Sequence, residues 1–143
     1  MIANSYEYIL RIERSEINFY FLIELWLTQI KVINSFMKIC IATTGPDLGS
    51  QISSVFGRAP YFLIVDSETE EFKAIENEAA KVSRGAGVAA AQTVANEKAE
   101  VVITGMVGPN AQMVLEQSGI KVISGVSGTA KEALEKFKSG ELK

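Results

Sequence analysis

Histidine is absent from the 143-residue chain, and cysteine occurs once, at Cys40. The lack of histidine excludes histidine general-base catalysis, a Ser-His-Asp triad and any histidine-bearing zinc site. A single thiol excludes a disulfide framework and fits a reducing compartment. No basic segment followed by a small-residue cleavage site marks the N-terminus as a secretory signal. We therefore expect a cytoplasmic protein.

The chain also lacks an excess of positive charge. Its 14 basic and 17 acidic side chains give a formal net charge of −3, which leaves no surplus of cations to neutralise the phosphates of a nucleic acid. The 48% hydrophobic and 22% charged residues are typical of a globular chain, and the length fits one domain of ordinary size. We expect one core and no general nucleic-acid binding.

Glycine is missing from residues 1–36, whereas all eleven glycines lie from Gly45 onward. Residues 1–36 instead hold seven of the twelve aromatic residues. Apolar residues recur at helical spacing between positions 17 and 33, which predicts a helix, but Glu24 and Lys31 interrupt the run and argue against a membrane span. We predict that residues 1–36 are an extension that the fold does not need. The alternative is that its helix docks onto a partner or lies at a membrane interface.

From Met37 onward the pattern changes to alternating strands and helices. Short apolar segments predict strands at 38–43, 61–66, 71–76, 101–104 and 121–124, and helices follow at about 83–98, 109–119 and 129–140. Thr129 and Glu132 have the spacing of a helix capping box. This order predicts a three-layer α/β/α domain over residues 37–143. Its five-stranded mixed sheet would have the order 3-2-1-4-5 with strand 2 antiparallel, a ribonuclease-H-like arrangement.

The predicted strand order creates a topological switch point between strands 1 and 4, where open α/β sheets usually bind ligands. Glycine-rich helix entries lie there, at SRGAG (83–87) and TGMVGPNA (104–111). Their backbone N–H groups and positive helix ends could receive an anion. Alternatively, these glycines serve only turn formation and close helix packing. The segment 104–111 lacks the spacing of a nucleotide-binding loop.

The candidate ligand-binding residues come from these segments and from the loops after strand 1. They are Asp47, Phe56, Gly57, Arg58, Arg84, Gly85, Gly87, Gly105, Gly108 and Asn110. A charge-assisted hydrogen bond contributes more than a helix end, so the two arginines should decide anion affinity. We expect Arg58 to contribute more than Arg84, because Arg58 lies beside the presumed ligand loop and Arg84 is expected to cap its helix.

No arrangement of acidic or nucleophilic residues in the sequence suggests catalysis. Ribonuclease-H chemistry needs several converging carboxylates to hold two metal ions, and the first strand offers none. We expect Cys40 to be a small buried hydrophobic residue. Glu68, Glu70 and Glu71 are expected to form a solvated hairpin tip. The residues alone therefore predict neither an enzyme nor a metal site.

Six segments together resemble a known family: MKICIAT, FGRAPYFLIVD, RGAG, VVITGMVGPNA, SGI and SGVSGTAKEAL. In this order they are similar to the dinitrogenase iron-molybdenum cofactor biosynthesis family, which includes NifX, NafY and the C-terminal domain of NifB. The resemblance covers about residues 37–143. It implies a ribonuclease-H-like fold and an association with binding or carrying iron–sulfur precursors of the nitrogenase cofactor.

The resemblance implies a small non-catalytic carrier, accessory to nitrogen fixation, whose crevice holds an iron–sulfur cluster, an iron-molybdenum cluster or another small anion. Such a cargo should be labile, because one cysteine and no histidine leave most iron sites without good protein ligands. Cofactor-handling members often carry histidine directly before the Phe-Gly pair, where this chain has Val55. The alternative function is a protein–protein interaction module without a metal cargo. A hydrolase has no support beyond analogy of fold.

Overall fold

The computed structural model describes residues 19–27 and 37–142. The chain divides into two units, Met1–Phe36 and Met37–Lys143. In the first unit, residues 19–27 are helical, and the rest of the helix predicted over positions 17–33 lies outside the described residues. No helix in the described ranges is long and apolar enough to cross a membrane.

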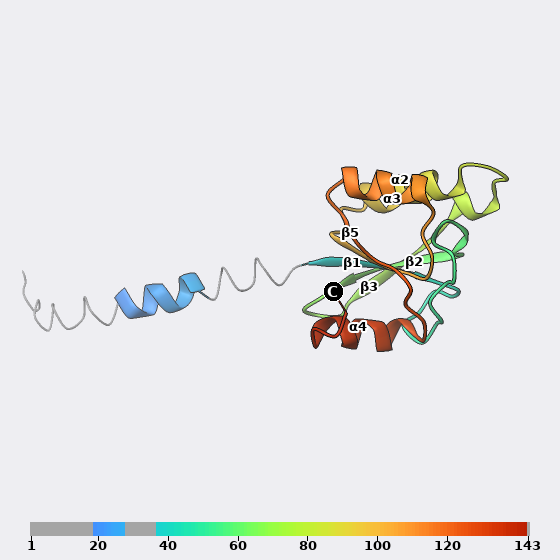
Figure 1. The fold of residues 1–143 in the computed structure, drawn as a ribbon. Helices are drawn as coiled ribbons and strands as arrows, with labels where there is room; N and C mark the ends of the chain where they lie inside the picture. The colour runs from blue at the N-terminus through green and yellow to red at the C-terminus, as the bar shows by residue number, and fades with distance from the viewer. Residues whose placement is uncertain (1–18, 28–36, 143) are drawn as a thin grey trace, which may run out of the picture. The chain divides into compact units, whose positions relative to one another are not determined.

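The second unit is built on a five-stranded mixed sheet (Figure 1). Its strands are β1 (Lys38–Thr43), β2 (Tyr61–Asp66), β3 (Phe72–Glu76), β4 (Val101–Ile103) and β5 (Lys121–Ile123). They lie in the order β3-β2-β1-β4-β5, with β2 antiparallel to both neighbours and β4 parallel to β1 and β5. The predicted sheet order and the antiparallel second strand are therefore confirmed.

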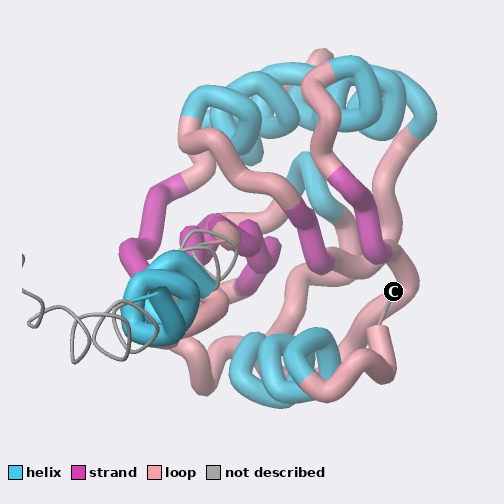
Figure 2. Tube along the Cα trace, turned by 90° about the vertical axis from the view of Figure 1, so that its left-hand side faces the viewer, coloured by secondary structure: helices cyan, strands magenta, loops and turns pink. Residues whose placement is uncertain are grey.

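Helices cover both faces of this sheet, which gives three layers. Figures 1 and 2 show α2 (Ala86–Asn96) and α3 (Pro109–Gln117) on one face and α4 (Ala130–Lys138) on the other. Two short 3-10 helices, η1 (Phe56–Arg58) and η2 (Glu78–Lys81), were not predicted. Both lie in connections, where a single turn leaves no helical repeat for sequence reasoning to detect.

The core forms two apolar layers, because successive side chains of a strand point to opposite faces of the sheet. In β1, Cys40 and Ala42 pack toward α2 and α3, whereas Ile39 and Ile41 pack toward α4. The prediction for Cys40 is confirmed, since its side chain is fully buried. Burial, together with the charge of Glu97, raises the pKa of the Cys40 thiol, so it stays protonated and behaves as a hydrophobic group.

The start of α4 carries the predicted capping box. The Glu132 N–H donates to the Thr129 hydroxyl (3.1 Å), and the Thr129 N–H donates to the Glu132 carboxylate (2.9 Å). Two orphan N–H groups of the first turn are thereby satisfied within the chain. The other two long helices of this unit begin differently, and that difference falls at the candidate site.

Candidate functional site

The loops that follow β1 and β4 are hydrogen-bonded to each other at the carboxyl ends of the parallel strands. The Gly105 N–H donates to the Ser53 carbonyl (3.1 Å), the Met106 N–H to the Ser54 carbonyl (2.7 Å) and the Phe56 N–H to the Met106 carbonyl (2.8 Å). A Cβ atom on Gly105 would lie 2.7 Å from the Ser53 carbonyl oxygen. Glycine at position 105 therefore allows the two loops to approach, and the switch point has a well-defined backbone.

A concave surface of about 290 Å³, here called the glycine hollow, lies where η1 meets the first turns of α2 and α3. Most of the predicted ligand-binding residues lie on it. Those that line it are Gly57, Arg58, Arg84, Gly85, Gly87, Gly108 and Asn110, together with Val55, Ser83, Ala86, Val88, Pro109 and Ala111. The fold thus brings together segments that lie more than 50 positions apart in the sequence, from Val55 to Ala111, as the switch-point argument expects.

The two helices that begin at the glycine hollow have no side-chain caps. Gly85 precedes α2 and Gly108 precedes α3, and neither position supplies a capping side chain. Within the described part of the chain, the N–H groups of residues 86–88 have no intramolecular acceptor. Free N–H groups and the positive end of each helix dipole favour an anion. Unlike the capped start of α4, these two helix starts therefore give the glycine hollow a positive electrostatic character.

Arg58 has a structural role that the sequence did not reveal. Its guanidinium donates hydrogen bonds to the carbonyl oxygens of Ala80 (3.0 Å) and Val82 (2.5 Å), with a longer one to Ser83 (3.4 Å). These bonds fasten η1 to the connection between η2 and α2. Three hydrogen bonds of the Arg58 guanidinium are thus made within the chain, which favours the opposite order of the two arginines to the one expected from the sequence.

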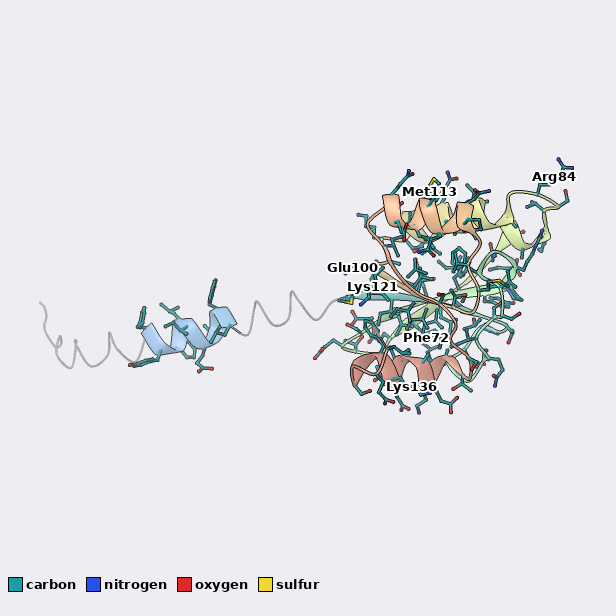
Figure 3. The ribbon with its side chains drawn as sticks, in the orientation of Figure 1. Phe72, Arg84, Glu100, Met113, Lys121 and Lys136 are labelled. Carbon is teal, nitrogen blue, oxygen red and sulfur yellow. The ribbon has the colours of Figure 1, made fainter. Side chains whose placement is uncertain are left out.

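Arg84 is the arginine whose donors are available at the glycine hollow. It is exposed on the loop before α2, and no hydrogen bond or ion pair engages it among the described residues. Figure 3 shows its side chain extending from this loop into solvent. The expectation that Arg84 caps its helix is incorrect, because the position before α2 is Gly85 and carries no side-chain cap.

Three predicted residues do not join the others. Phe56 is fully buried and packs against Phe62, with 5.2 Å between ring centroids, so its side chain belongs to the core. Asp47 is exposed, and its carboxylate accepts the N–H of Gly49 (3.0 Å) and so stabilises its own loop. Gly105 lines a second concave surface instead. Sequence spacing placed all three residues near the ligand loops but could not show whether each one lines the glycine hollow.

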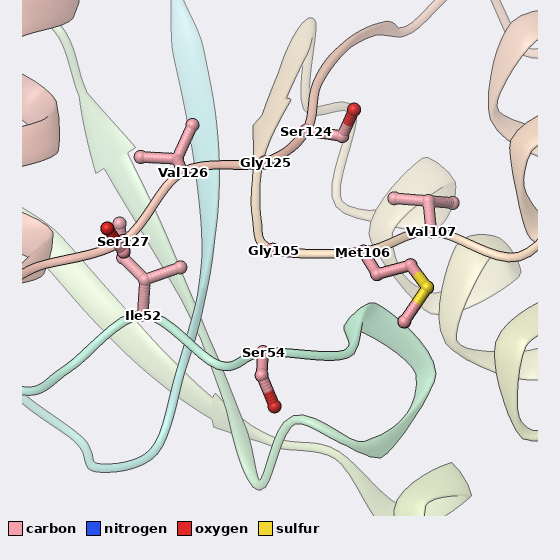
Figure 4. Close-up of a pocket in the computed structure, with 9 residues that line it drawn as sticks. All are labelled: Ile52, Ser54, Gly105, Met106, Val107, Ser124, Gly125, Val126 and Ser127. Carbon is pink, nitrogen blue, oxygen red and sulfur yellow. The ribbon is translucent and has the colours of Figure 1, made fainter.

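The second concave surface, here called the serine hollow, has a volume of about 520 Å³ and was not predicted (Figure 4). It is lined by Ile52, Ser54, Gly105, Met106, Val107, Ser124, Gly125, Val126 and Ser127. These residues belong to the loops after β1, β4 and β5. The two hollows adjoin, because Val55 on the glycine hollow is bridged to Met106 on the serine hollow. The SGVSG segment after the fifth strand was the signal that could have indicated it.

The described residues contain no cluster of three or more histidine, cysteine, aspartate or glutamate side chains that could hold a metal ion. The chain's one thiol, on Cys40, is buried in the core below the sheet's carboxyl edge. The two hollows therefore offer backbone N–H donors, hydroxyl groups, one exposed thioether, the carboxamide of Asn110 and the guanidinium groups of Arg58 and Arg84.

Residues 37–140 match the family described as "Dinitrogenase iron-molybdenum cofactor". The chain belongs to this family. Among curated protein sequences, none is significantly similar to the chain.

Solved structures show the same family fold. The apo form of the orange protein from Desulfovibrio gigas is similar with 34% sequence identity and a TM-score of 0.73, covering 76% of this chain and 92% of that protein. An NMR structure of a Thermotoga protein assigned to NifB has 34% identity and a TM-score of 0.66, covering 75% of this chain and 91% of the other. The three-layer fold with its 3-2-1-4-5 sheet is thus shared.

The residue before the Phe-Gly pair lies at the junction of the two hollows. Val55 stands directly before Phe56 and Gly57, and it lines the glycine hollow. Its backbone forms the bridge to Met106. In this chain the position therefore contributes an apolar side chain, not an imidazole, at the junction of the two hollows.

Proposed function

We propose that this family member is a non-catalytic carrier that holds a small anionic metal–sulfur cluster at the glycine hollow. The observation that carries the proposal is the convergence of two uncapped helix N-termini and the unengaged Arg84 on one concave surface. Membership in the iron-molybdenum cofactor family supports a cluster as the cargo. An iron–sulfur or iron-molybdenum cluster fits this role, with the protein acting in the cytoplasm as an accessory of nitrogenase cofactor assembly.

The chemistry of the hollow suits reversible binding. Each helix end contributes only about 0.3–1 kcal/mol toward an exposed anion, whereas a charge-assisted hydrogen bond contributes about 1.5–3 kcal/mol. Neither hollow offers a thiolate or an imidazole to a metal, so the cargo is held mainly through its own negative charge and acceptor atoms. A carrier that must hand over its cargo benefits from such labile binding, and a carrier needs no acid–base pair.

The test is an anaerobic titration of the full chain with tetrathiomolybdate, a coloured dianion that contains molybdenum and sulfide. We expect Arg84→Ala to weaken binding by about tenfold or more, because it removes a charge-assisted contact. Lys121→Ala is the matched control. It removes an equal charge at the start of β5, at the end of the sheet opposite to the glycine hollow (Figure 3). Equal affinity in the wild type and in both variants would refute the anion site.

The variant Arg58→Ala tests whether Arg58 only holds the segment 80–83 in place or also contacts the anion. Its loss should loosen residues 80–83, which native-state hydrogen exchange would report as faster exchange in this segment. We expect its effect on tetrathiomolybdate affinity to be smaller than that of Arg84→Ala. A larger effect without faster exchange would mean that Arg58 contacts the anion directly.

A second candidate function, a protein-interaction module, is favoured by the helical residues 19–27. This segment exposes large apolar side chains, including Trp26 at 62% exposure, with Glu24 as its one charged residue. If docking were the main role, the full chain would self-associate or form a stoichiometric complex without any anion. Light scattering of the full chain and of residues 37–143 would detect self-association, and equal tetrathiomolybdate binding by both would assign the cargo site to residues 37–143.

A further inference from the structure

Met106 is a large apolar side chain that the fold leaves exposed at the centre of the ligand-binding edge. It is 63% exposed and lies on the lining of the serine hollow. Figure 4 shows its sulfur-bearing side chain on this surface, among the loops that follow β1 and β4. Burial in the core does not account for this residue, since neither core layer includes it.

The backbone of Met106 is held firmly although its side chain is exposed. Its N–H donates to the Ser54 carbonyl (2.7 Å), and its carbonyl accepts the N–H of Phe56 (2.8 Å). The preceding Gly105 is locked by close approach to the carbonyls of residues 53 and 54. The thioether is therefore presented from a fixed point at the topological switch point, and only its side-chain torsions remain free.

Met106 also carries the only sulfur atom on either hollow among the described residues. Cys40 is fully buried and protonated, and Met37 packs against the core layer under α4. Met113 is exposed to a similar degree, at 56%, but it lies on α3 and lines neither hollow. Thioethers are soft donors that prefer thiophilic metals over hard cations such as Mg²⁺ or Ca²⁺.

We propose that Met106 contacts a thiophilic metal centre of the cargo in the serine hollow while the glycine hollow receives the anionic part. The bridge between Val55 and Met106 places these two surfaces side by side. Ser54, Ser124 and Ser127 line the same hollow, so the Met106 thioether is its one soft donor among otherwise polar and aliphatic side chains. The inference rests on the proposed carrier function and names the residue that selects a soft metal over a hard one.

The experiment uses the full chain labelled with ¹³C in the methionine methyl groups and titrated with silver(I) nitrate, a thiophilic metal alone, in chloride-free buffer. We expect the Met106 methyl resonance to shift at a silver concentration at least tenfold lower than the Met113 resonance. Met106→Leu should weaken silver binding by about tenfold, and the matched control Met113→Leu should leave it unchanged. Both residues are exposed and leucine is close in volume, so the variants should fold.

Silver binding to the Cys40 thiol is controlled for by repeating the titrations in a Cys40→Ala background. The Met106 methyl resonance must again shift at a lower silver concentration than the Met113 resonance. Equal response of the two methyl groups, or wild-type silver affinity in Met106→Leu, would overturn the assignment of Met106. The titration with tetrathiomolybdate distinguishes this failure from failure of the carrier function. If silver does not prefer Met106 but tetrathiomolybdate binding still depends on Arg84, only the thioether contact is rejected. If silver prefers Met106 but tetrathiomolybdate does not bind, only the anion carrier is rejected.

Discussion

Gly57 and Gly87 meet backbone to backbone at the glycine hollow: a Cβ atom on Gly57 would lie 2.8 Å from both the Cα and the N atom of Gly87. Gly57 belongs to η1 and Gly87 to the first turn of α2. This contact allows the first turn of α2 to approach the ligand loop, and it leaves the N–H groups of that turn beside the hollow. The shape of the site thus depends on two residues that have no side chain.

Gly57→Ala should destabilise the protein by about 1–3 kcal/mol, because the added methyl group would meet backbone that cannot rotate away. Gly49→Ala is the control, since its Cβ would meet only the exposed carboxylate of Asp47 at 3.3 Å. Urea unfolding of the wild type and both variants measures the difference. Equal stability of the two variants would show that η1 and α2 can separate without cost.

Two buried threonines at the carboxyl ends of neighbouring strands should respond oppositely to replacement by valine. The Thr43 hydroxyl donates to the Gly45 carbonyl (2.7 Å), so Thr43→Val should cost about 0.5–1.5 kcal/mol. The Thr104 hydroxyl has no hydrogen-bond partner among the described residues. Thr104→Val should therefore leave stability unchanged or raise it by about 1 kcal/mol. Destabilisation of both variants in urea unfolding would mean that the Thr104 hydroxyl is hydrogen-bonded in solution.

The α4 cap should make stability depend on pH in the acid range. Hydrogen bonds from Thr129 lower the pKa of Glu132 below its ordinary value of 4.5. A carboxyl whose folded pKa is depressed stabilises the fold above its unfolded pKa, and this contribution is lost as pH falls through the folded pKa. Glu132→Gln should thus be less stable than the wild type at pH 7, and the gap should narrow at pH 3.

Chemical unfolding at several pH values measures that gap. Glu135→Gln is the control, since Glu135 is exposed on the same helix and takes no part in the cap. A gap between wild type and Glu132→Gln that stays constant from pH 7 to pH 3 would contradict a role for the carboxylate in the cap.

Residues 37–143 should unfold cooperatively without the first 36 residues. Both described core layers are formed by residues from Met37 onward, and the family match also begins there. Thermal unfolding of the full chain and of residues 37–143 under identical conditions is the measurement. A shortened chain that shows no cooperative transition would place the aromatic segment in the core.

The predicted elements of residues 37–143 agree with the structure to within a few residues, because strand and helix periodicity is a local property. The T-x-x-E spacing identified the start of α4 for the same reason. The differences lie at the ends: β3 begins at Phe72, not Glu71, and β4 ends at Ile103, before Thr104. The two 3-10 helices were missed because each is a single turn.

The candidate site was predicted in part. Strand order and glycine-rich helix entries indicated the carboxyl edge, and seven of the ten named residues line the glycine hollow. Phe56 was misplaced because the sequence beside a ligand loop is the same whether the aromatic side chain faces the core or the solvent. The serine hollow was missed because the SGVSG segment (124–128) indicates a loop after the fifth strand but does not show that this loop lies against those after β1 and β4.

The sequence by itself determined the three long helices and five strands of residues 37–143, because periodicity and capping residues act between near neighbours in the chain. Connection rules gave the order of the sheet, and motif order gave the family. Only the tertiary structure decided that Gly57 meets Gly87, that Arg58 is bound to carbonyls 22 to 25 positions away, and that Met106 is held by a loop from the other side of the switch point. These relationships depend on which segments pack together, and packing joins residues far apart in sequence through contacts that no local pattern records.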